Sequence, residues 1–179
     1  MFHDALVAFA ERRIIIMEQK LNECYERIYE QCKKTLPIEW TEVRIWAERY
    51  EEEYQAPAGE YWDYDSLTVY KDTQGKWHRT PNIDKEFSEE ADFFYVRNAP
   101  TKIIKDIYRI FEEAGMERFK VFNYTVDAEG HFQVNFQYEY SQGDSFIERV
   151  TLWEYEQTGY TGTNSSKEIV KKYHPEFEG

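Results

Sequence analysis

Two aspartates at strand spacing are the residues of this sequence with the greatest potential for chemistry. Asp63 and Asp65 stand two residues apart and would share one face of a strand, beside Tyr61 and Leu67. Such a pair can hold a divalent metal or act as an acid and a base. No third ligand follows at a defined spacing, so we interpret the pair as the polar edge of a solvated strand. The alternative is a metal-dependent hydrolase that recruits a distant histidine, and it predicts tight binding of divalent metal ions.

The histidines provide no second pattern of this kind. None has a Cys, His or carboxylate partner at a metal-binding spacing such as HxxxH, and we interpret them as structural residues. The sequence also lacks the GxSxG, P-loop and GxGxxG motifs. We therefore expect no enzymatic activity, no cofactor and no bound metal. The four histidines are His3, His78, His131 and His174.

The two cysteines indicate a reducing environment. Cys24 and Cys32 fall on one predicted helix, where eight residues correspond to a rise of about 12 Å. Two Cα atoms more than about 7 Å apart cannot be joined by a disulfide. We expect free thiols on or near a buried helix face, in a cytoplasmic protein.

Charge and aromatic content limit the classes of partner. The formal net charge is -13, which repels phosphate backbones and attracts basic proteins, although acidic surfaces also simply keep proteins soluble. We expect no direct nucleic-acid binding. An aromatic content of 18% is too high for a disordered chain, and no apolar run approaches the ~20 residues of a membrane span.

Acidic and aromatic residues interleave in one part of the chain. Aromatic side chains anchor protein interfaces, and acidic neighbours select basic partners. Rows of aromatic residues are also common in ordinary strands. We nevertheless predict the partner-binding surface here, at Glu51, Glu52, Glu53, Tyr54, Trp62, Asp63 and Asp65.

A hairpin organises the elements that must position these residues. Residues 132–140 alternate between apolar and polar side chains, from Phe132 to Tyr140, which predicts a strand with one buried face. Gly130 permits a tight reversal before it, and a second aromatic run precedes that turn. The stretch from Phe119 to Tyr140 is therefore predicted as an antiparallel hairpin that needs a helix to cover its aromatic face.

Periodicity and breaker residues predict the other elements. The predicted fold is α+β: an antiparallel sheet of about five strands with N-terminal, central and C-terminal helices packed on it. A strand at 151–155 remains an alternative to the last helix. The elements are a helix at 17–36, a strand at 41–50, a loop at 51–59, strands at 60–70 and 76–79, a loop at 81–90, a helix from Pro100 to Ala114, the hairpin, and a helix from Asp144 or Ser145 to Gln157.

Both ends of the chain are predicted to lie outside the main domain, residues 17–159. Residues 1–16 do not have the order of a signal peptide. Glu11, Arg12 and Arg13 can be encoded by GAA-AGG-AGG, a ribosome-binding sequence, so Met17 is a candidate native start; the alternative is a genuine N-terminal helix. The gene's codons would decide between the two. Residues 160–179 are predicted to be a flexible tail, with a short helix possible near its end.

Several motifs in this order resemble the YezG-like immunity proteins. They are the run from Pro37 to Trp40, the strand that opens at Gly130-His131-Phe132, and Arg149…Trp153-Glu154-Tyr155…Gly159. The resemblance covers roughly Leu21 to Gly159 and consists of dispersed aromatic and glycine positions. Thr158 stands where the family tends to have an apolar residue.

The resemblance implies a function without catalysis. Members of this family are bacterial antitoxins that bind and neutralise nuclease toxins secreted by Gram-positive bacteria, and they have no catalytic residues. It thus implies a cognate toxin as partner, with a basic nuclease domain that suits the acidic charge of this chain. A non-catalytic adaptor or regulatory module that binds another basic protein is the alternative. The position of the gene beside a toxin gene would separate the two.

Overall fold

The computed structural model describes the backbone of residues 2–55, 61–80 and 90–178, and the side chains of 13–49, 66–80, 100 and 102–178. The described strands form one antiparallel sheet in the order β3-β2-β1-β4-β5, which confirms the predicted α+β class. In chain order the elements are α1 (Phe2–Thr35), β1 (Trp40–Gln55), β2 (Tyr61–Asp72), β3 (Trp77–Thr80), α2 (Glu90–Ala114), β4 (Val121–Asp127), β5 (Phe132–Gln137), α3 (Phe146–Thr158) and α4 (Asn164–Tyr173).

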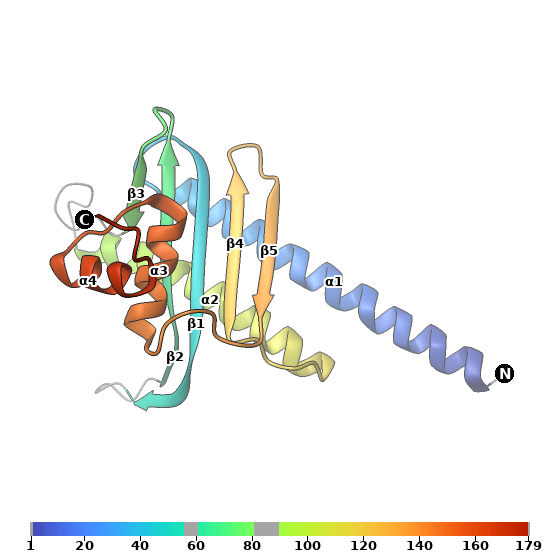
Figure 1. Ribbon diagram of the computed structural model, residues 1–179. Coiled ribbons are helices and arrows are strands. Elements are labelled where there is room, and N and C mark those ends of the chain that lie inside the picture. The colour runs from blue at the N-terminus through green and yellow to red at the C-terminus, as the bar shows by residue number, and fades with distance from the viewer. Residues whose placement is uncertain (1, 56–60, 81–89, 179) are drawn as a thin grey trace.

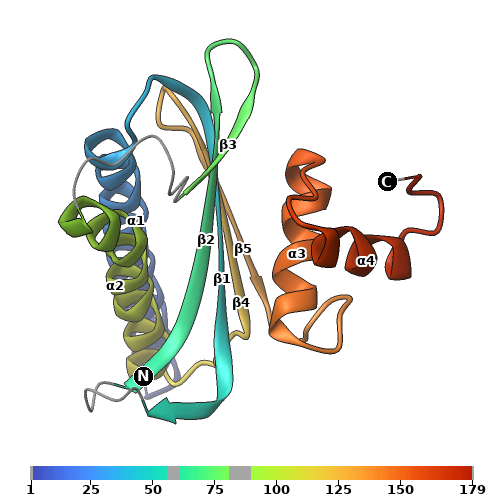
Figure 2. The ribbon, with the colours of Figure 1, turned by 90° about the vertical axis from the view of Figure 1, so that its left-hand side faces the viewer.

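Helices cover both faces of this sheet, but not equally. The long helices α1 and α2 lie on one face, which we call the inner face, and α3 and α4 lie on the other, the outer face (Figure 2). The pair α3 and α4 stands over β1 and β2, whereas β4 and β5 are uncovered on the outer face (Figure 1). None of the helices in the described part of the chain combines the length and apolar character needed to cross a membrane.

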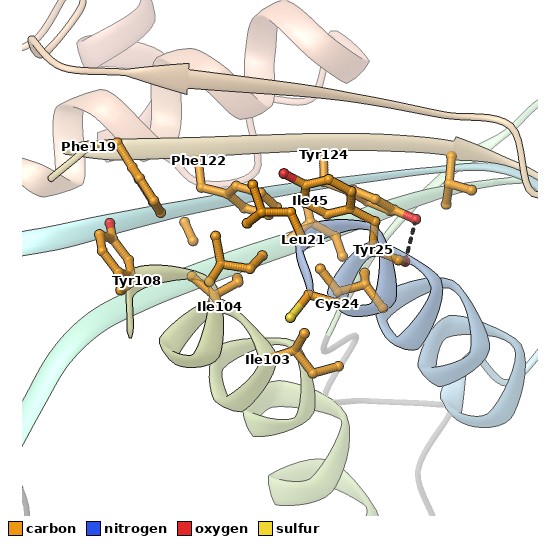
Figure 3. Packing of buried hydrophobic residues seen from close by; sticks show 14 of the residues in the cluster. Leu21, Cys24, Tyr25, Ile45, Ile103, Ile104, Tyr108, Phe119, Phe122 and Tyr124 are labelled. Carbon is orange, nitrogen blue, oxygen red and sulfur yellow. Dashed lines mark hydrogen bonds between the residues drawn. The ribbon is translucent and has the colours of Figure 1, made fainter. Parts of the chain in front are cut away.

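The hydrophobic core lies between the inner face and the long helices (Figure 3). Ile28 of α1, Ile104 of α2 and Phe122 of β4 are fully buried within it. Burying an aliphatic or aromatic side chain of this size stabilises the fold by about 1.5–3 kcal/mol. The buried Tyr124 hydroxyl joins β4 to α1 within the core by donating to the Tyr25 carbonyl at 3.0 Å.

The predicted hairpin is confirmed. β4 and β5 pair antiparallel, and Gly130 adopts a φ of 91° in the turn between them. A Cβ atom at this glycine would lie 3.2 Å from the Tyr29 ring, so both the conformation and the close approach of α1 require glycine. Phe132, Val134 and Phe136 face the helices, as their alternation predicts, but β5 ends at Gln137 and not at Tyr140.

The last predicted helix is confirmed as α3, which excludes a strand at 151–155. Ser145 caps its N-terminus by accepting a hydrogen bond from Glu148 N at 3.3 Å. Gly159 ends it in the left-handed region with a φ of 72°. The two cysteines also lie on one helix, α1, as buried free thiols.

Helix α2 begins earlier than the sequence predicts. It starts at Glu90, so the predicted start at Pro100 is wrong, and part of the predicted loop at 81–90 lies outside the described residues. A proline inside a helix removes one backbone donor and commonly ends the helix. Here Pro100 is buried, immediately before the apolar stripe that begins at Ile103. Packing at the centre of α2 thus outweighs a local signal for a helix start.

Strand β1 and the C-terminal region also differ from prediction. β1 continues to Gln55 instead of giving way to a loop at Glu51, because its end pairs with β2 after a register shift between Arg49 and Tyr54. The segment predicted as a flexible tail contains α4, whose Val170 is fully buried. At the other end α1 runs without a break from Phe2, so residues 2–16 precede the predicted domain as helix. Met17 as the native start stays a prediction.

Candidate functional site

The outer face of the sheet carries a groove beside α3, which we call the outer groove. It has a volume of about 470 Å³, with β1, β4 and β5 as its floor and α3 as one wall. Amide side chains line both sides, including Asn123 of β4, Asn135 of β5 and Gln157 of α3. Amides both donate and accept hydrogen bonds, as a polypeptide backbone does. Among the described side chains, Asn123 Oδ1 is buried here with no hydrogen-bond partner, so the groove offers an unused acceptor.

A buried ion pair fixes α3 against the sheet at one end of the outer groove. The Arg149 guanidinium binds both carboxylate oxygens of Glu48, with Nε to Oε2 at 2.8 Å, and the Glu48 side chain is only 1% exposed. The guanidinium also lies 4.0 Å from the centre of the Tyr140 ring and donates to the Gly143 carbonyl. Two parallel hydrogen bonds and an aromatic face leave Arg149 little freedom, so it acts as a clamp.

Aromatic contacts complete the attachment of α3. The Trp46 ring of β1 meets Phe146 at 5.5 Å and Trp153 at 6.4 Å between ring centres. Arg44 Nη1 donates to Gln157 Oε1 at 2.8 Å at the far end of the helix. These contacts hold the groove wall at three points along α3, so its shape is preset rather than induced.

The opposite side of α3 is also anchored by charged groups. Glu154 is 7% exposed and pairs with Arg79 of β3 at 3.3 Å; burial raises the pKa of Glu154 above its ordinary value. On α4, Lys172 Nζ lies 2.9 Å from Glu148 Oε1. This hydrogen bond is the main cause that lowers the pKa of Glu148 to about 2. The same bond network joins Tyr173 to Glu148 at 3.0 Å, which attaches α4 to α3.

Two histidines pair with aspartates of nearby turns. His78 Nε2 lies 2.7 Å from Asp72 Oδ2, and its ring stacks on Tyr70. His131 Nδ1 lies 2.9 Å from Asp127 Oδ2 at the hairpin turn, and this hydrogen bond raises the pKa of His131. Desolvation alone would raise the pKa of Asp127, but its hydrogen bonds with His131 outweigh that effect and lower it. Both pairs have a local structural role, because each aspartate also accepts backbone N–H groups of its own turn.

The hairpin turn also gathers three potential metal ligands that the sequence analysis missed. Asp127, Glu129 and His131 place one donor atom each within 4.8 Å of one another. Glu129 and His131 are exposed, and Asp127 and His131 already pair with each other. Exposed groups that satisfy one another in a turn form a weak ligand set, so we assign no metal to them.

The cysteines are not suited to nucleophilic chemistry. Burial raises the pKa of the Cys24 thiol and raises that of Cys32 to about 12. A thiol must ionise to act as a nucleophile, so both remain protonated at neutral pH.

The predicted acidic and aromatic surface lies at the distal end of the β1–β2 pair. Its residues belong to the end of β1 and the start of β2, where Tyr54 pairs with Trp62 and Asp65 with Glu48. Their side chains lie outside those that the structure describes, so this surface stays a prediction. The residues concerned are Glu51, Glu52, Glu53, Tyr54, Trp62, Asp63 and Asp65.

The outer groove could not be predicted from local sequence patterns, because its walls come from segments about a hundred residues apart. Arg149 and Trp153 belong to a motif of the predicted resemblance, and they are its one sequence signal. Glu48 gave no signal of its own, because Glu42, Arg44 and Arg49 are charged residues of the same strand.

Comparison with known proteins assigns the fold to a family. A family model described as "Immunity protein YezG-like" matches residues 21–171. The match runs from α1 into α4 and therefore includes every element of the outer groove. It also continues past Gly159, where the resemblance was expected to end. The chain matches no curated protein sequence.

Proposed function

This chain belongs to the YezG-like immunity protein family, and we propose that it binds and neutralises a cognate secreted nuclease toxin by direct protein–protein inhibition. The family match over residues 21–171 is the observation that carries this proposal. An immunity protein implies a toxin as partner, and the nuclease activity of that toxin is the finer part of the proposal.

The charge of the chain supports a nuclease as the target. Nucleases that act on phosphate backbones need cationic surfaces, and a protein with a net charge of -13 attracts such a surface over a long range. Electrostatic attraction mainly raises the association rate, which matters for an inhibitor that must act before its target cleaves DNA or RNA. We therefore expect association to slow as the salt concentration rises.

The chemistry of the described side chains supports inhibition without catalysis. The buried carboxylate of Glu48 is occupied by Arg149, and His78 and His131 pair within their own turns. The buried cysteine thiols stay protonated and therefore cannot act as nucleophiles. An inhibitor of this kind would act in the cytoplasm, where the nucleic acid of the producing cell needs protection, and its surface would act as a ligand for the toxin.

Copurification followed by a nuclease assay tests the proposal. The protein encoded by the adjacent upstream gene would be coexpressed with this chain, and DNA and RNA cleavage would be measured with and without this chain. A stable complex with suppressed cleavage is the expected result. A neighbour that neither binds this chain nor cleaves nucleic acid would contradict the proposal, and binding without any nuclease activity would favour an adaptor role.

A further inference from the structure

Strand β5 ends the sheet with one row of backbone groups directed outward. Asp127 N donates to His131 O at 3.1 Å and Lys120 N to Gln137 O at 2.8 Å, so the odd-numbered residues of β5 bond to β4. Bonding alternates along an antiparallel strand, so the N–H and C=O groups of Phe132, Val134 and Phe136 point away from β4. In the described part of the chain no other strand pairs with β5.

This edge lacks the usual protection against an additional strand. Natural proteins place charged residues, prolines or bulges on exposed edges to prevent unwanted pairing. β5 reads Phe-Gln-Val-Asn-Phe-Gln and carries neither charge nor proline, in a chain in which charged residues make up 32%. Charge returns on either side of it, at Glu129 and at Glu139, whose side chain is 87% exposed and pairs with Lys120 at 3.2 Å. An uncharged edge with acidic flanks suits an extended segment with basic ends.

The core is incompletely covered at the same edge. On β4 the inward side chains of Phe122, Tyr124 and Val126 are at most 1% exposed, whereas those of Phe132 and Val134 on β5 are only half-buried. An added strand would bury the remaining apolar surface of β5.

Helix α1 continues past β5, so it provides a surface on which the inner side of an added strand can pack. Tyr25 of α1 contacts Phe132 of β5 at 5.3 Å between ring centres, and the helix then extends beyond the sheet (Figure 1). From Phe2 to Lys20 this overhang measures about 28 Å, at 1.5 Å per residue. Adjacent strands are about 4.8 Å apart, so the overhang is long enough to underlie further strands.

The described part of the overhang is apolar on the face that continues the core. Ile14 and Met17 precede Leu21 at helical spacing; Met17 packs against the core cluster, and Ile14 is 53% exposed. With Ile110 and Met116 they line a groove of about 240 Å³ between α1 and the end of α2. Exposed isoleucine and methionine side chains at such a position indicate a surface that becomes buried in a complex.

We propose that β5 is the docking edge for an extended strand of the toxin, which pairs with the outward backbone groups of β5 and rests its apolar side on the overhang of α1. This inference rests on the proposed function and names the surface that performs it. The toxin segment would alternate apolar and polar residues, since one side of the added strand would contact α1 and the other would continue the uncovered outer face of the sheet. Lysine or arginine at its ends would meet the acidic flanks of β5.

A second copy of this chain is a poorer occupant of the same edge. Antiparallel pairing of two β5 strands requires a two-fold axis perpendicular to the sheet at β5. Since α1 crosses directly behind β5, that axis would bring two α1 helices into the same layer at the same place (Figures 1 and 2). A strand supplied by a partner without its own helix in this layer avoids the collision.

A proline at Val134 tests the strand pairing directly. Val134→Pro removes an N–H group that points away from β4, so the ladder between β4 and β5 is kept, whereas the bond to an added strand is lost. Val134→Ala is the matched control, because it shortens the side chain and leaves the N–H in place. We expect Val134→Pro to weaken toxin affinity roughly tenfold and Val134→Ala to change it by less than about threefold. Circular dichroism and thermal melting would confirm that both variants fold.

Two further measurements test the geometry independently of the proline. Ile14→Glu should weaken affinity, whereas Ile147→Glu, at an isoleucine that is 59% exposed on α3, should not. Hydrogen exchange at the amides of Phe132, Val134 and Phe136 should slow when the adjacent gene's toxin domain is added. The wild-type chain is the reference for all of these measurements.

The outcomes separate this inference from the proposed function. If the wild-type chain fails to bind and inhibit the toxin domain, the proposed function fails and this inference fails with it. If the wild-type chain inhibits, but Val134→Pro binds as tightly as Val134→Ala and the β5 amides gain no protection, only the docking edge is wrong. A dimer of this chain that Val134→Pro dissociates while toxin affinity is unchanged would also overturn it, in favour of a second copy at β5.

Discussion

Breaking the ion pair between Arg149 and Glu48 should destabilise the protein, because this pair holds α3 against the sheet. Arg149→Met keeps most of the side-chain volume but removes the charge that compensates Glu48, whose side chain is 1% exposed. It also removes the contact with the Tyr140 ring and the bond to the Gly143 carbonyl. The variant therefore leaves a buried carboxylate without its partner.

The size of the effect follows from the burial of this pair. Removing one partner of a buried ion pair costs about 3–5 kcal/mol, because the other charge stays desolvated and uncompensated. Small domains have total stabilities of about 5–15 kcal/mol, so the loss is a large fraction of the whole. Replacing both partners by methionine removes both buried charges at once. The double variant Glu48→Met/Arg149→Met should therefore lie within about 2 kcal/mol of the wild type.

Urea denaturation followed by circular dichroism measures these differences. The single variant should unfold at a lower midpoint with an unchanged slope, and the double variant should recover most of the loss. If the double variant is as unstable as the single variant, or less stable, then the buried charge of Glu48 is not the cause and the reasoning is refuted. With the single variant Glu48→Met as the fourth protein, the double-mutant cycle would then give a coupling energy near zero, which would point to packing alone.

Three smaller predictions concern the core, a turn and pH. Tyr124→Phe removes a buried hydroxyl that donates to α1 and should cost about 1 kcal/mol in urea denaturation. Gly143→Ala should lower the melting temperature, because φ is 106° and the new Cβ would lie 2.8 Å from Arg149 Cγ. The folded-state pKa of His131 is raised above its ordinary 6.5 by Asp127, so its stabilising contribution is present at lower pH and lost as pH rises through the raised value. An NMR titration of His131 that gives the ordinary value would contradict this assignment.

The hairpin and α3 could be predicted because their signals are local. The alternation of β5 and the freedom of Gly130 specify a strand and a turn without knowledge of the rest of the chain. Ser145 and Gly159 likewise mark both ends of α3. These features depend on the backbone geometry at single positions, and the residue type at each position favours that geometry.

Long-range packing explains where prediction from sequence failed. Pro100 is a genuine signal for a helix start, yet α2 continues through it. The run of three glutamates from Glu51 lies within β1 because β2 pairs with β1 on both sides of it, at Arg49 and at Tyr54. Val170 shows the same effect in the C-terminal region: α3 gives it a surface to pack on, so residues that would be flexible alone form α4.

The candidate sites depend even more on tertiary structure. The acidic and aromatic surface around Asp63 was found from composition, whereas the outer groove and the β5 edge depend on which segments become neighbours. No local pattern shows that Arg149 meets Glu48, or that α1 extends beyond β5. The uncharged sequence of β5 was visible, but its meaning depends on its position at the end of the sheet.

Titrating the toxin's nuclease activity with this protein tests the central claim most directly. The toxin domain encoded beside this gene would be held at a fixed concentration, and its cleavage of nucleic acid measured as purified protein is added. Inhibition by direct binding predicts that activity falls in proportion to the added protein, reaches its minimum at a stoichiometric ratio, and returns when the two proteins are separated. Activity that persists in an excess of this protein, or that is lost permanently at a small fraction of the toxin concentration, would contradict it.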